Sequence, residues 1–541
     1  MTEKQPETTE KAAKTERRQF RAIKGTRDIL PPDSALWNWF ENSAHEVFES
    51  YNFRDIRTPI FEETSLFARA VGAETDIVHK EMYSFSAVEG ELEELDRLQD
   101  YILFYSAPGS DQERFDEFRS FVAQFIERYR IAQSRNLLVL GREPVNRGEF
   151  QDLENAFGAL PNGANAPNTR RVAGEIQVHV SAITLAPTFA LRPEATASVC
   201  RAYIEHGMQM LPGNQKLYYV GPMFRRERPQ KGRYRQFYQV GAEVLGTSDA
   251  PAIDAEVLEM LLAFFARVGL ANIKLYINSI GHNAENCRRG YVEKLRGELG
   301  KVKDRLKEDS QRRIETNPLR VLDSKLPEEQ PVIEKLPRIS DHLCDACREH
   351  FAKLKDELAL RGIGYEENWR LVRGLDYYTR TTFEVTAAGL GSQNAVCGGG
   401  RYDGLVELLG GPVGIKGMGF AIGTDRAILS IQESGNLPKL PGLAVFIAWM
   451  GGKAYAPAVA IAKKLRASGM AVELPPEEMK FKKSLGLADK LGARYALIIG
   501  EDEAASHTFT LKRLSDGQQD KLDESALLER LESEFRGPNA R

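Results

Sequence analysis

Residues 216–246 read KLYYVGPMFRRERPQKGRYRQFYQVGAEVLG. Two runs rich in aromatic and β-branched residues flank a polar loop, which predicts two antiparallel strands joined by a long connection. The loop sets six cations, Arg225, Arg226, Arg228, Lys231, Arg233 and Arg235, against one acid, Glu227. Such loops are usually solvated surface. Arg225, however, follows directly on a strand, where a rigid backbone can aim its guanidinium at a phosphate.

Two further arginines stand beside short motifs elsewhere in the chain. Arg373 precedes GLDYYTR, and Arg426 ends the glycine-spaced run GMGFAIGTDR at 417–426. Three anchored cations suit phosphoryl chemistry. The glycines at 398–400 are neither a P-loop nor a dinucleotide fingerprint, so alone they indicate only close backbone approach.

Four polar side chains could recognise an amino acid: Glu194, Thr196, Gln239 and Glu243. Carboxylates, an amide and a hydroxyl can hold an ammonium group and an imidazole N–H. Equally, they could be polar residues at a sheet edge that face water.

The remaining sequence indicates several units. Residues 36–51 have helical spacing, and 54–61 form a strand pattern broken by Thr58 and Pro59. Residues 282–365 are charged and largely helical in pattern, which suggests an insertion into a sheet domain. From about 440, strand and helix patterns alternate, which predicts a small α/β domain.

Composition limits the class of protein. The chain has 541 residues, 42% hydrophobic and 28% charged, too long for one ordinary core. No apolar run is long enough for a bilayer, no secretory signal is visible, and five cysteines suggest no disulfide framework, so we expect a cytoplasmic protein. The net charge of −4 argues against a general polyanion binder, although a local basic surface suffices for tRNA.

Cys344 and Cys347 form a C-x-x-C pair with His342 and His350 nearby, which are ligand types that suit zinc. The whole run has a helical pattern. A second ligand pair would have to come from Cys287 or His282, and no spacing points there. We therefore predict no metal site.

Taken in order, the motifs resemble class II aminoacyl-tRNA synthetases, and most closely the histidyl-tRNA synthetase family. The segments that carry the resemblance are IKGTRDILP at 23–31, FRDIRTPIFEETSLFARAVGAETDIVHKEMYSF at 53–85, LRPEAT at 191–196, FRRERPQKGRYRQFYQVGAEVLG at 224–246, NPLRVLDSK at 317–325, VRGLDYYTRTTFE at 372–384, CGGGRYDGLVELLGG at 397–411 and GMGFAIGTDR at 417–426. The resemblance spans nearly the whole chain from residue 21.

The resemblance implies a multidomain α/β protein. It would have a class II catalytic domain at 21–435, built as an antiparallel sheet with helices (α+β) and interrupted by the mainly helical insertion at 282–365. A C-terminal α/β anticodon-binding domain would follow at 440–541, and residues 1–20 would be a disordered tail. The family also implies a homodimer formed through the segment around Arg57 and Pro59.

It further implies the roles of the site residues. Arg225 would bind the ATP α-phosphate, Arg426 the γ-phosphate side, and Arg373 the histidine carboxylate and α-phosphate; Glu227 and Arg233 would also contact ATP. The amino group of histidine would be held by Glu194, Thr196 and Gln239, and its imidazole surrounded by Glu243, Tyr377, Tyr378 and Tyr402. Mg²⁺ is implied by the use of ATP, with no ligand cluster to locate it.

The implied reaction is ATP-dependent formation of histidyl-adenylate, then transfer to the 3′-terminal adenosine of tRNA(His), with AMP and pyrophosphate released. The expected partners are L-histidine, ATP, tRNA(His) and a second copy of the chain, without DNA or membrane. The alternative is a catalytically silent, histidine-binding regulatory paralogue. Such a protein would typically lack the tRNA domain and the activating arginine, whereas the 440–541 domain and Arg373 are present here.

One departure from the family is large. There the MYSF-like and LRPE-like strands are joined by a short hairpin, whereas here 105 residues separate Phe85 from Leu191. Within this 86–187 insertion, ELEELDRLQDYILFYS and DEFRSFVAQFIERYRIAQ have helical periodicity. It could be a decoration of this subfamily or an added contact for tRNA or a partner, the latter suggested by Arg128, Arg130 and Arg135.

Overall fold

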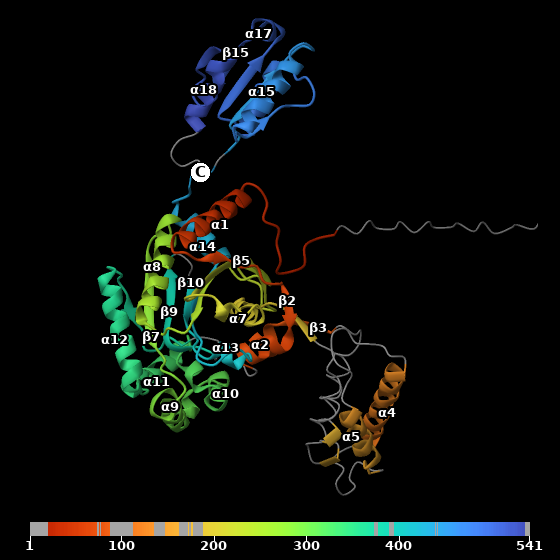
Figure 1. The fold of residues 1–541 in the computed structure, drawn as a ribbon, viewed down its shortest axis with the longest axis vertical. Helices are drawn as coiled ribbons and strands as arrows, with labels where there is room; N and C mark the ends of the chain where they lie inside the picture. Colours follow the sequence, from red (N-terminus) through yellow and green to blue (C-terminus); the bar gives the residue numbers. More distant parts are fainter. Residues whose placement is uncertain are drawn as a thin grey trace, which may run out of the picture. The chain divides into compact units, whose positions relative to one another are not determined.

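The computed structural model describes the following residues: 20–72, 75, 77–86, 112–134, 147–161, 171–172, 175–176, 188–372, 377–388, 394–438, 440 and 442–535. The chain divides into two compact units, Met1–Leu437 and Pro438–Arg541 (Figure 1). Among the described residues, no helix combines the length and the apolar character needed to cross a membrane.

A mixed sheet forms the framework of the first unit. Its described strands follow the order β1-β5-β6-β11-β10-β9-β7-β8. Their bounds are β1 Arg54–Asp55, β5 Gln215–Phe224, β6 Gln236–Gly246, β7 Ile273–Ser279, β8 Glu366–Glu367, β9 Thr379–Ala387, β10 Ala395–Arg401 and β11 Lys416–Gly423. The six central strands are antiparallel, and only the short edge strands β1 and β8 pair in parallel. The hairpin predicted over 216–246 is confirmed, because β5 pairs antiparallel with β6 from Gln215↔Leu245 to Phe224↔Gln236.

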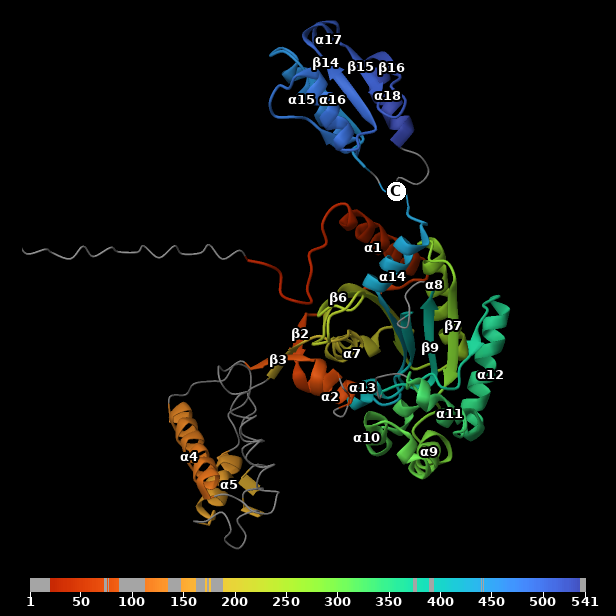
Figure 2. The ribbon, with the colours of Figure 1, turned by 180° about the vertical axis from the view of Figure 1, so that it is seen from behind.

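Two groups of helices accompany this sheet. The helices α1 Asp33–Ser50, α8 Pro251–Arg267 and α14 Thr424–Ser434 pack against one another or the sheet, with the rings of Phe40 and Phe264 5.0 Å apart. The helices α2 Thr64–Val71, α7 Thr196–Glu205 and α13 Leu405–Leu408 form a second contacting group, which lies apart from α1 and α14 (Figure 2). The start of α7 and the end of β11 bring polar residues to the sheet.

A three-stranded sheet, β2 Phe61–Glu63, β4 Thr188–Leu191 and β3 Tyr83–Ser86, accounts for the predicted break at Thr58 and Pro59. The break lies between β1, which joins the large sheet, and β2, which joins this small one. The 86–187 insertion leaves from paired strands, because Ser86 lies opposite Thr188. Its second predicted helix is confirmed as α4 Gln112–Ser134, followed by α5 Arg147–Gly158. The first predicted helix, the tail at 1–19 and the side chains of Arg128, Arg130 and Arg135 lie outside the described residues.

Between β7 and β8 the chain is mainly helical. Its elements are η3 Glu285–Arg289, α9 Gly290–Lys301, η4 Lys303–Arg305, α10 Glu308–Thr316, η5 Pro318–Val321, η6 Pro327–Glu329, α11 Gln330–Ile333, η7 Ile339–His342 and α12 Asp345–Leu360. Apolar side chains such as Leu295, Leu299 and Ile333 are fully buried within it. This segment therefore carries its own part of the core.

The second unit is a compact α/β fold. Its sheet has the order β13-β12-β14-β15-β16, with strands Val472–Glu473, Val445–Trp449, Tyr495–Ile499, Thr508–Arg513 and Gln519–Asp523. Its helices are α15 Tyr455–Ala467, α16 Phe481–Lys490, α17 Glu501–Ser506 and α18 Glu524–Phe535. Strands β13, β12 and β14 are parallel, as the alternating strand and helix patterns predict. Its apolar residues form a separate buried cluster around Val445, Leu465 and Leu497.

Candidate active site

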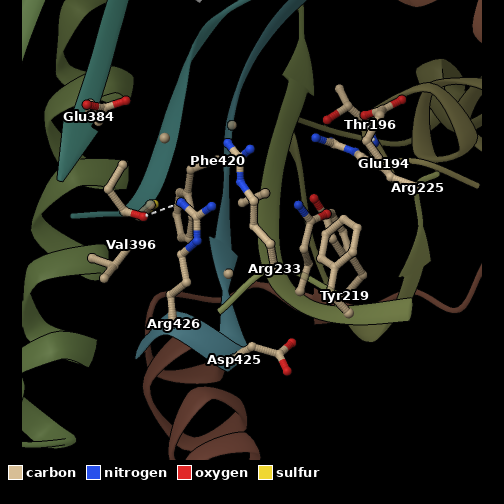
Figure 3. A pocket seen from close by; sticks show the side chains of 18 of the residues that line it. Glu194, Thr196, Tyr219, Arg225, Arg233, Glu384, Val396, Phe420, Asp425 and Arg426 are labelled. Atoms are coloured by element: carbon tan, nitrogen blue, oxygen red, sulfur yellow. Dashed lines mark hydrogen bonds between the residues drawn. The ribbon is translucent and has the colours of Figure 1, made fainter. Parts of the chain in front are cut away.

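One cavity of about 360 Å³ in the first unit collects the predicted side chains. It is lined by Glu194, Thr196, Arg225, Glu227, Arg233, Gln239, Glu243, Tyr377, Tyr378, Tyr402 and Arg426, together with other residues of β6, β10 and β11 (Figure 3). Arg373 lies outside the described residues, although Tyr377, four positions later, is in the wall. Residues from five separate sequence motifs thus share one cavity.

At one end of this cavity, buried carboxylates are held by short hydrogen bonds. Glu243 accepts hydrogen bonds from the Thr196 hydroxyl at 2.7 Å and the Tyr402 hydroxyl at 2.6 Å. Glu194 accepts the backbone N–H groups of Thr196 at 2.7 Å and Ala197 at 3.1 Å, at the start of α7. Glu194 is therefore fixed where the N-terminal end of a helix stabilises negative charge.

Burial changes the ionisation of both acids. It raises the pKa of Glu243 to about 8; the Tyr402 and Thr196 hydroxyls lower that pKa, and the nearby Glu194 raises it. Burial also raises the pKa of Glu194, against the hydrogen bonds from Ala197 and Thr196. Two carboxyl groups that resist ionisation without a ligand are suited to a ligand that brings positive charge or N–H donors.

Three tyrosines complete this end. The rings of Tyr377 and Tyr378 lie 4.8 Å apart, and those of Tyr377 and Tyr402 lie 5.8 Å apart. Gln239, on β6 like Glu243, has a buried side-chain oxygen with no hydrogen-bond partner among the described residues. A buried acceptor without a partner costs free energy, which a donor on a bound molecule would recover.

Glycines on β11 make room for these side chains. A Cβ atom on Gly419 would lie 1.8 Å from Glu243 Oε2, and one on Gly417 would lie 2.1 Å from the Tyr402 ring. Alternate residues of a strand share one face. The glycine spacing of GMGFAIG therefore leaves that face of β11 open to the carboxylate and the tyrosine.

Three arginines line the rest of the cavity: Arg225 lies beside Glu194, and Arg233 and Arg426 lie next to each other (Figure 3). The Nε atom of Arg225 donates to the Pro193 carbonyl at 2.9 Å, while Arg426 donates to the Gly232 carbonyl at 3.2 Å and the Ala395 carbonyl at 3.0 Å. Burial, then the charges of Arg233 and Arg225, lower the pKa of Arg426, although Glu227 acts in the opposite direction. Like charges held close by backbone carbonyls favour an anion such as a polyphosphate.

Known proteins resemble the whole chain. The family model described as histidyl-tRNA synthetase matches residues 185–427, and the anticodon binding domain model matches 444–534. A histidine–tRNA ligase of Koribacter versatilis is 44% identical over 512 residues, which cover 94% of this chain and 95% of the relative. This chain belongs to the histidyl-tRNA synthetase family.

Other members of the family agree. The histidine–tRNA ligase of Solibacter usitatus is 44% identical over 514 residues and covers 95% of this chain and 99% of its own length. The crystal structure of apo S. aureus histidyl-tRNA synthetase is 31% identical, with a TM-score of 0.65 and coverage of 95% of this chain and 100% of that chain. The family's class II architecture, an antiparallel-sheet catalytic domain followed by an anticodon-binding domain, is thus confirmed.

Several lining residues were not predicted from the sequence. Tyr219, Phe237, Glu384 and Phe420 also face the cavity, and the Arg225 guanidinium lies 5.4 Å from the centre of the Phe237 ring. For Phe237 the available signal was its spacing from Gln239 and Glu243 on β6, since alternate residues of a strand share one face.

Asp425 joins two segments that are far apart in the sequence, which only the three-dimensional structure reveals. It forms an ion pair with Arg27 at 2.8 Å and accepts the Tyr238 N–H at 3.0 Å. It therefore anchors the N-terminal motif IKGTRDILP to the start of α14, next to Arg426. Nothing in the local sequence around Asp425 indicates a partner so far away in the chain.

Sequence spacing did not point to Cys287 or His282 as the second ligand pair for Cys344 and Cys347, but the fold supplies both. The structure places His282 and Cys287 beside them, with all four candidate ligand atoms within 4.8 Å of one another. The C-x-x-C run is not wholly helical, because Cys344 is extended (φ −66°, ψ 163°) and only precedes α12. His342 and His350 do not belong to this cluster of four.

Proposed function

We propose that this chain is a histidine–tRNA ligase, which activates L-histidine with ATP and transfers it to the 3′-terminal adenosine of tRNA(His). The observation that carries the proposal is the cavity itself, where a pocket of carboxylates and tyrosines continues into a region lined by Arg225, Arg233 and Arg426. A zwitterionic amino acid with an N–H-bearing ring fits the first end, and a triphosphate fits the second.

The amino acid pocket favours histidine. We propose that Glu194, Thr196 and Gln239 receive the amino group, and that Glu243 and Tyr402, linked at 2.6 Å, receive the imidazole together with Tyr377 and Tyr378. A ring N–H donated to Glu243 in addition to the Tyr402 and Thr196 hydroxyls favours the ionised carboxylate. Amino acids without such donors would leave buried acceptors unpaired, which can give strong discrimination without editing.

The arginines act on the phosphates. In the activation step, a carboxylate oxygen of histidine attacks the ATP α-phosphorus, and the bond to the pyrophosphate breaks. We propose that Arg225 and Arg373 neutralise charge at the α-phosphate, and that Arg426 and Arg233 bind the outgoing phosphates near Glu227. Positioning and electrostatic stabilisation account for such catalysis without a covalent enzyme intermediate.

Mg²⁺ fits the phosphate end of the cavity. It prefers oxygen ligands and retains several waters beside phosphate oxygens. Glu194 and Glu243 are buried among their hydrogen bonds, and Asp425 is paired with Arg27. We propose that the ion uses the other lining carboxylates, Glu384 and Glu227, of which Glu227 would exchange its 3.2 Å ion pair with Arg233 for the metal. Its contribution there would be to offset phosphate charge.

In the second step, the 3′-hydroxyl of the terminal adenosine attacks the carbonyl of the mixed anhydride, and AMP leaves. We propose that the second unit, which matches the anticodon binding domain model at 444–534, reads the anticodon end of tRNA(His). We propose that the chain acts in the cytoplasm.

We also propose a homodimer that uses the segment around Arg57 and Pro59 and the small sheet that follows. Phe61 and Phe85 on that sheet are 51% and 41% exposed, and their rings lie 6.3 Å apart beside Phe189. Exposed aromatic groups of this kind mark interaction surfaces. Sedimentation should show a dimer that Phe61→Asp weakens and Leu360→Asp, at a more exposed apolar position on α12, leaves intact.

The proposal is tested by charging tRNA with radiolabelled histidine. The chain should attach histidine to tRNA(His) in the presence of ATP, and Arg373→Ala should reduce that rate by roughly 10²-fold or more, as removal of one stabilising donor does. A folded chain that binds histidine and charges no tRNA would contradict it and favour the silent paralogue.

A further inference from the structure

A second cluster of reactive side chains lies in the first unit, outside the cavity. It consists of His282 and Cys287, from the loop after β7, and Cys344 and Cys347, at the start of α12. The Nδ1 atom of His282 lies 3.2 Å from the Cys347 sulfur and 3.7 Å from the Cys344 sulfur. These four residues form the Cys3His cluster.

We propose that the Cys3His cluster binds one Zn²⁺ ion with all four side chains as ligands. Three thiolates and one imidazole are a common ligand set of closed, tetrahedral structural zinc sites. With Zn–S bonds of about 2.3 Å and Zn–N bonds of about 2.0 Å, ligand atoms at the corners of a tetrahedron lie about 3.5 to 3.8 Å apart. The His282–Cys347 and His282–Cys344 separations of 3.2 and 3.7 Å are close to these values, and all four ligand atoms lie within 4.8 Å of one another.

The backbone around the cluster is shaped to bring the ligands together. Cys344 is extended and Cys347 lies in the first turn of α12, so the C-x-x-C pair spans the start of the helix. Opposite it, Gly281 adopts φ +62°, and a Cβ atom there would lie 2.6 Å from the Cys287 sulfur. The N–H of Arg288 bonds back to the His282 carbonyl at 3.2 Å, which closes the loop that carries the other two ligands.

The nearby histidines of the original motif have other contacts. His350 makes a 3.1 Å hydrogen bond with the Asp249 carbonyl, and His342 stacks against Tyr291 with ring centres 5.6 Å apart. A site with four protein ligands leaves no open position for substrate, so its role is structural.

The position of the cluster suggests what the ion stabilises. The cluster joins the start of the insertion, at His282 and Cys287, to the start of α12, at Cys344 and Cys347. Cys287 and Cys344 are 57 positions apart in the sequence, and the cluster lies beside β9. The N–H of Arg380 on β9 donates to the Gly281 carbonyl at 2.7 Å, and the Arg288 guanidinium donates to the carbonyl of Tyr378, a residue of the cavity. The zinc site therefore anchors the loop that supports the tyrosine wall.

The test uses the full chain, produced without a histidine tag and dialysed against a chelator. Elemental analysis should find about one zinc per chain, and Cys344→Ser and Cys347→Ser should lose it. Cys200→Ser is the matched control, because Cys200 is also buried but lies outside the cluster, and it should keep its zinc. Circular dichroism and a thermal melt establish that each variant is folded.

Two measurements on the wild type remain decisive if a variant does not fold. A mercurial reagent should release one zinc to an indicator dye, and cobalt substitution should give the charge-transfer and ligand-field bands of a tetrahedral thiolate site. Less than a stoichiometric amount of metal in wild-type protein with all five thiols reduced, or a disulfide within the cluster, would overturn the proposal. Neither measurement depends on ligase activity.

Discussion

At the scale of single residues, the least ordinary group is Glu243. Glu243 is 1% exposed, and its carboxyl accepts hydrogen bonds from two hydroxyls. Burial raises its pKa from 4.5 to about 8. In the ligand-free enzyme it therefore stays protonated at neutral pH, until a histidine N–H makes ionisation favourable.

This predicts a pH effect on stability. Because the folded pKa is raised, the unfolded chain releases this proton first as the pH increases, so the folded state loses stability between pH 4.5 and about 8. Glu243→Gln resembles the protonated acid and does not titrate. Without ligand, the melting temperature of Glu243→Gln minus that of the wild type should increase from pH 5 to pH 8. A constant difference over this range would contradict the raised pKa of Glu243.

The arginines provide a second prediction. Arg225→Ala and Arg426→Ala should each slow single-turnover formation of histidyl-adenylate by roughly 10² to 10³-fold, because each removes a charge aimed at phosphate. Arg228→Ala is the control, since Arg228 is exposed on the same loop and does not line the cavity. Equal losses in all three variants would mean that the loop contributes only general positive charge.

The ordered motifs were sufficient to predict these residues, because each motif is local in sequence. Longer-range pairings were not visible. Asp425 meets Arg27 across 398 positions, and His282 meets Cys347 across 65. Sequence spacing carries no information on such contacts, because the path of the chain between the two partners is set by tertiary packing.

At the scale of elements, strand β11 shows how small side chains shape the cavity. Gly419→Ala would place a methyl group 1.8 Å from Glu243 Oε2 and 2.5 Å from the Ala242 carbonyl oxygen. Overpacking of this kind costs about 1 to 3 kcal/mol and moves neighbouring groups. The variant should melt at a lower temperature and show a higher KM for histidine.

Gly297→Ala serves as its control. Gly297 lies within α9, and a Cβ atom there would meet nothing within 4 Å. Alanine at an open helical position is neutral or stabilising by up to about 1 kcal/mol. A normal KM in Gly419→Ala would show that the wall formed by Glu243 and Tyr402 is not the histidine pocket.

Elements with strong periodicity were predictable, and those fixed by tertiary pairing were not. The β5–β6 hairpin and α4 appear where apolar patterns predict them. The helical pattern around Cys344 was misleading, because the chain is extended there and the helix begins only at Asp345. Packing of the neighbouring loop, rather than local propensity, sets that boundary.

At the scale of the molecule, the two units have separate cores. The second unit buries Val445, Leu465 and Leu497 in a cluster of its own, and the cavity lies wholly within the first. A chain ended after Leu437 should therefore keep histidine-dependent adenylate formation and lose most charging of tRNA(His). Loss of both activities in a folded truncated chain would show that activation needs the second unit.

The most direct test of the account is ATP–pyrophosphate exchange measured with each of the twenty amino acids. The cavity joins a pocket for an imidazole to a site for a triphosphate, so exchange should occur with histidine alone and fall sharply in Glu243→Ala and Arg225→Ala. Exchange with several amino acids, or with none in a folded protein that binds histidine, would contradict the central claim.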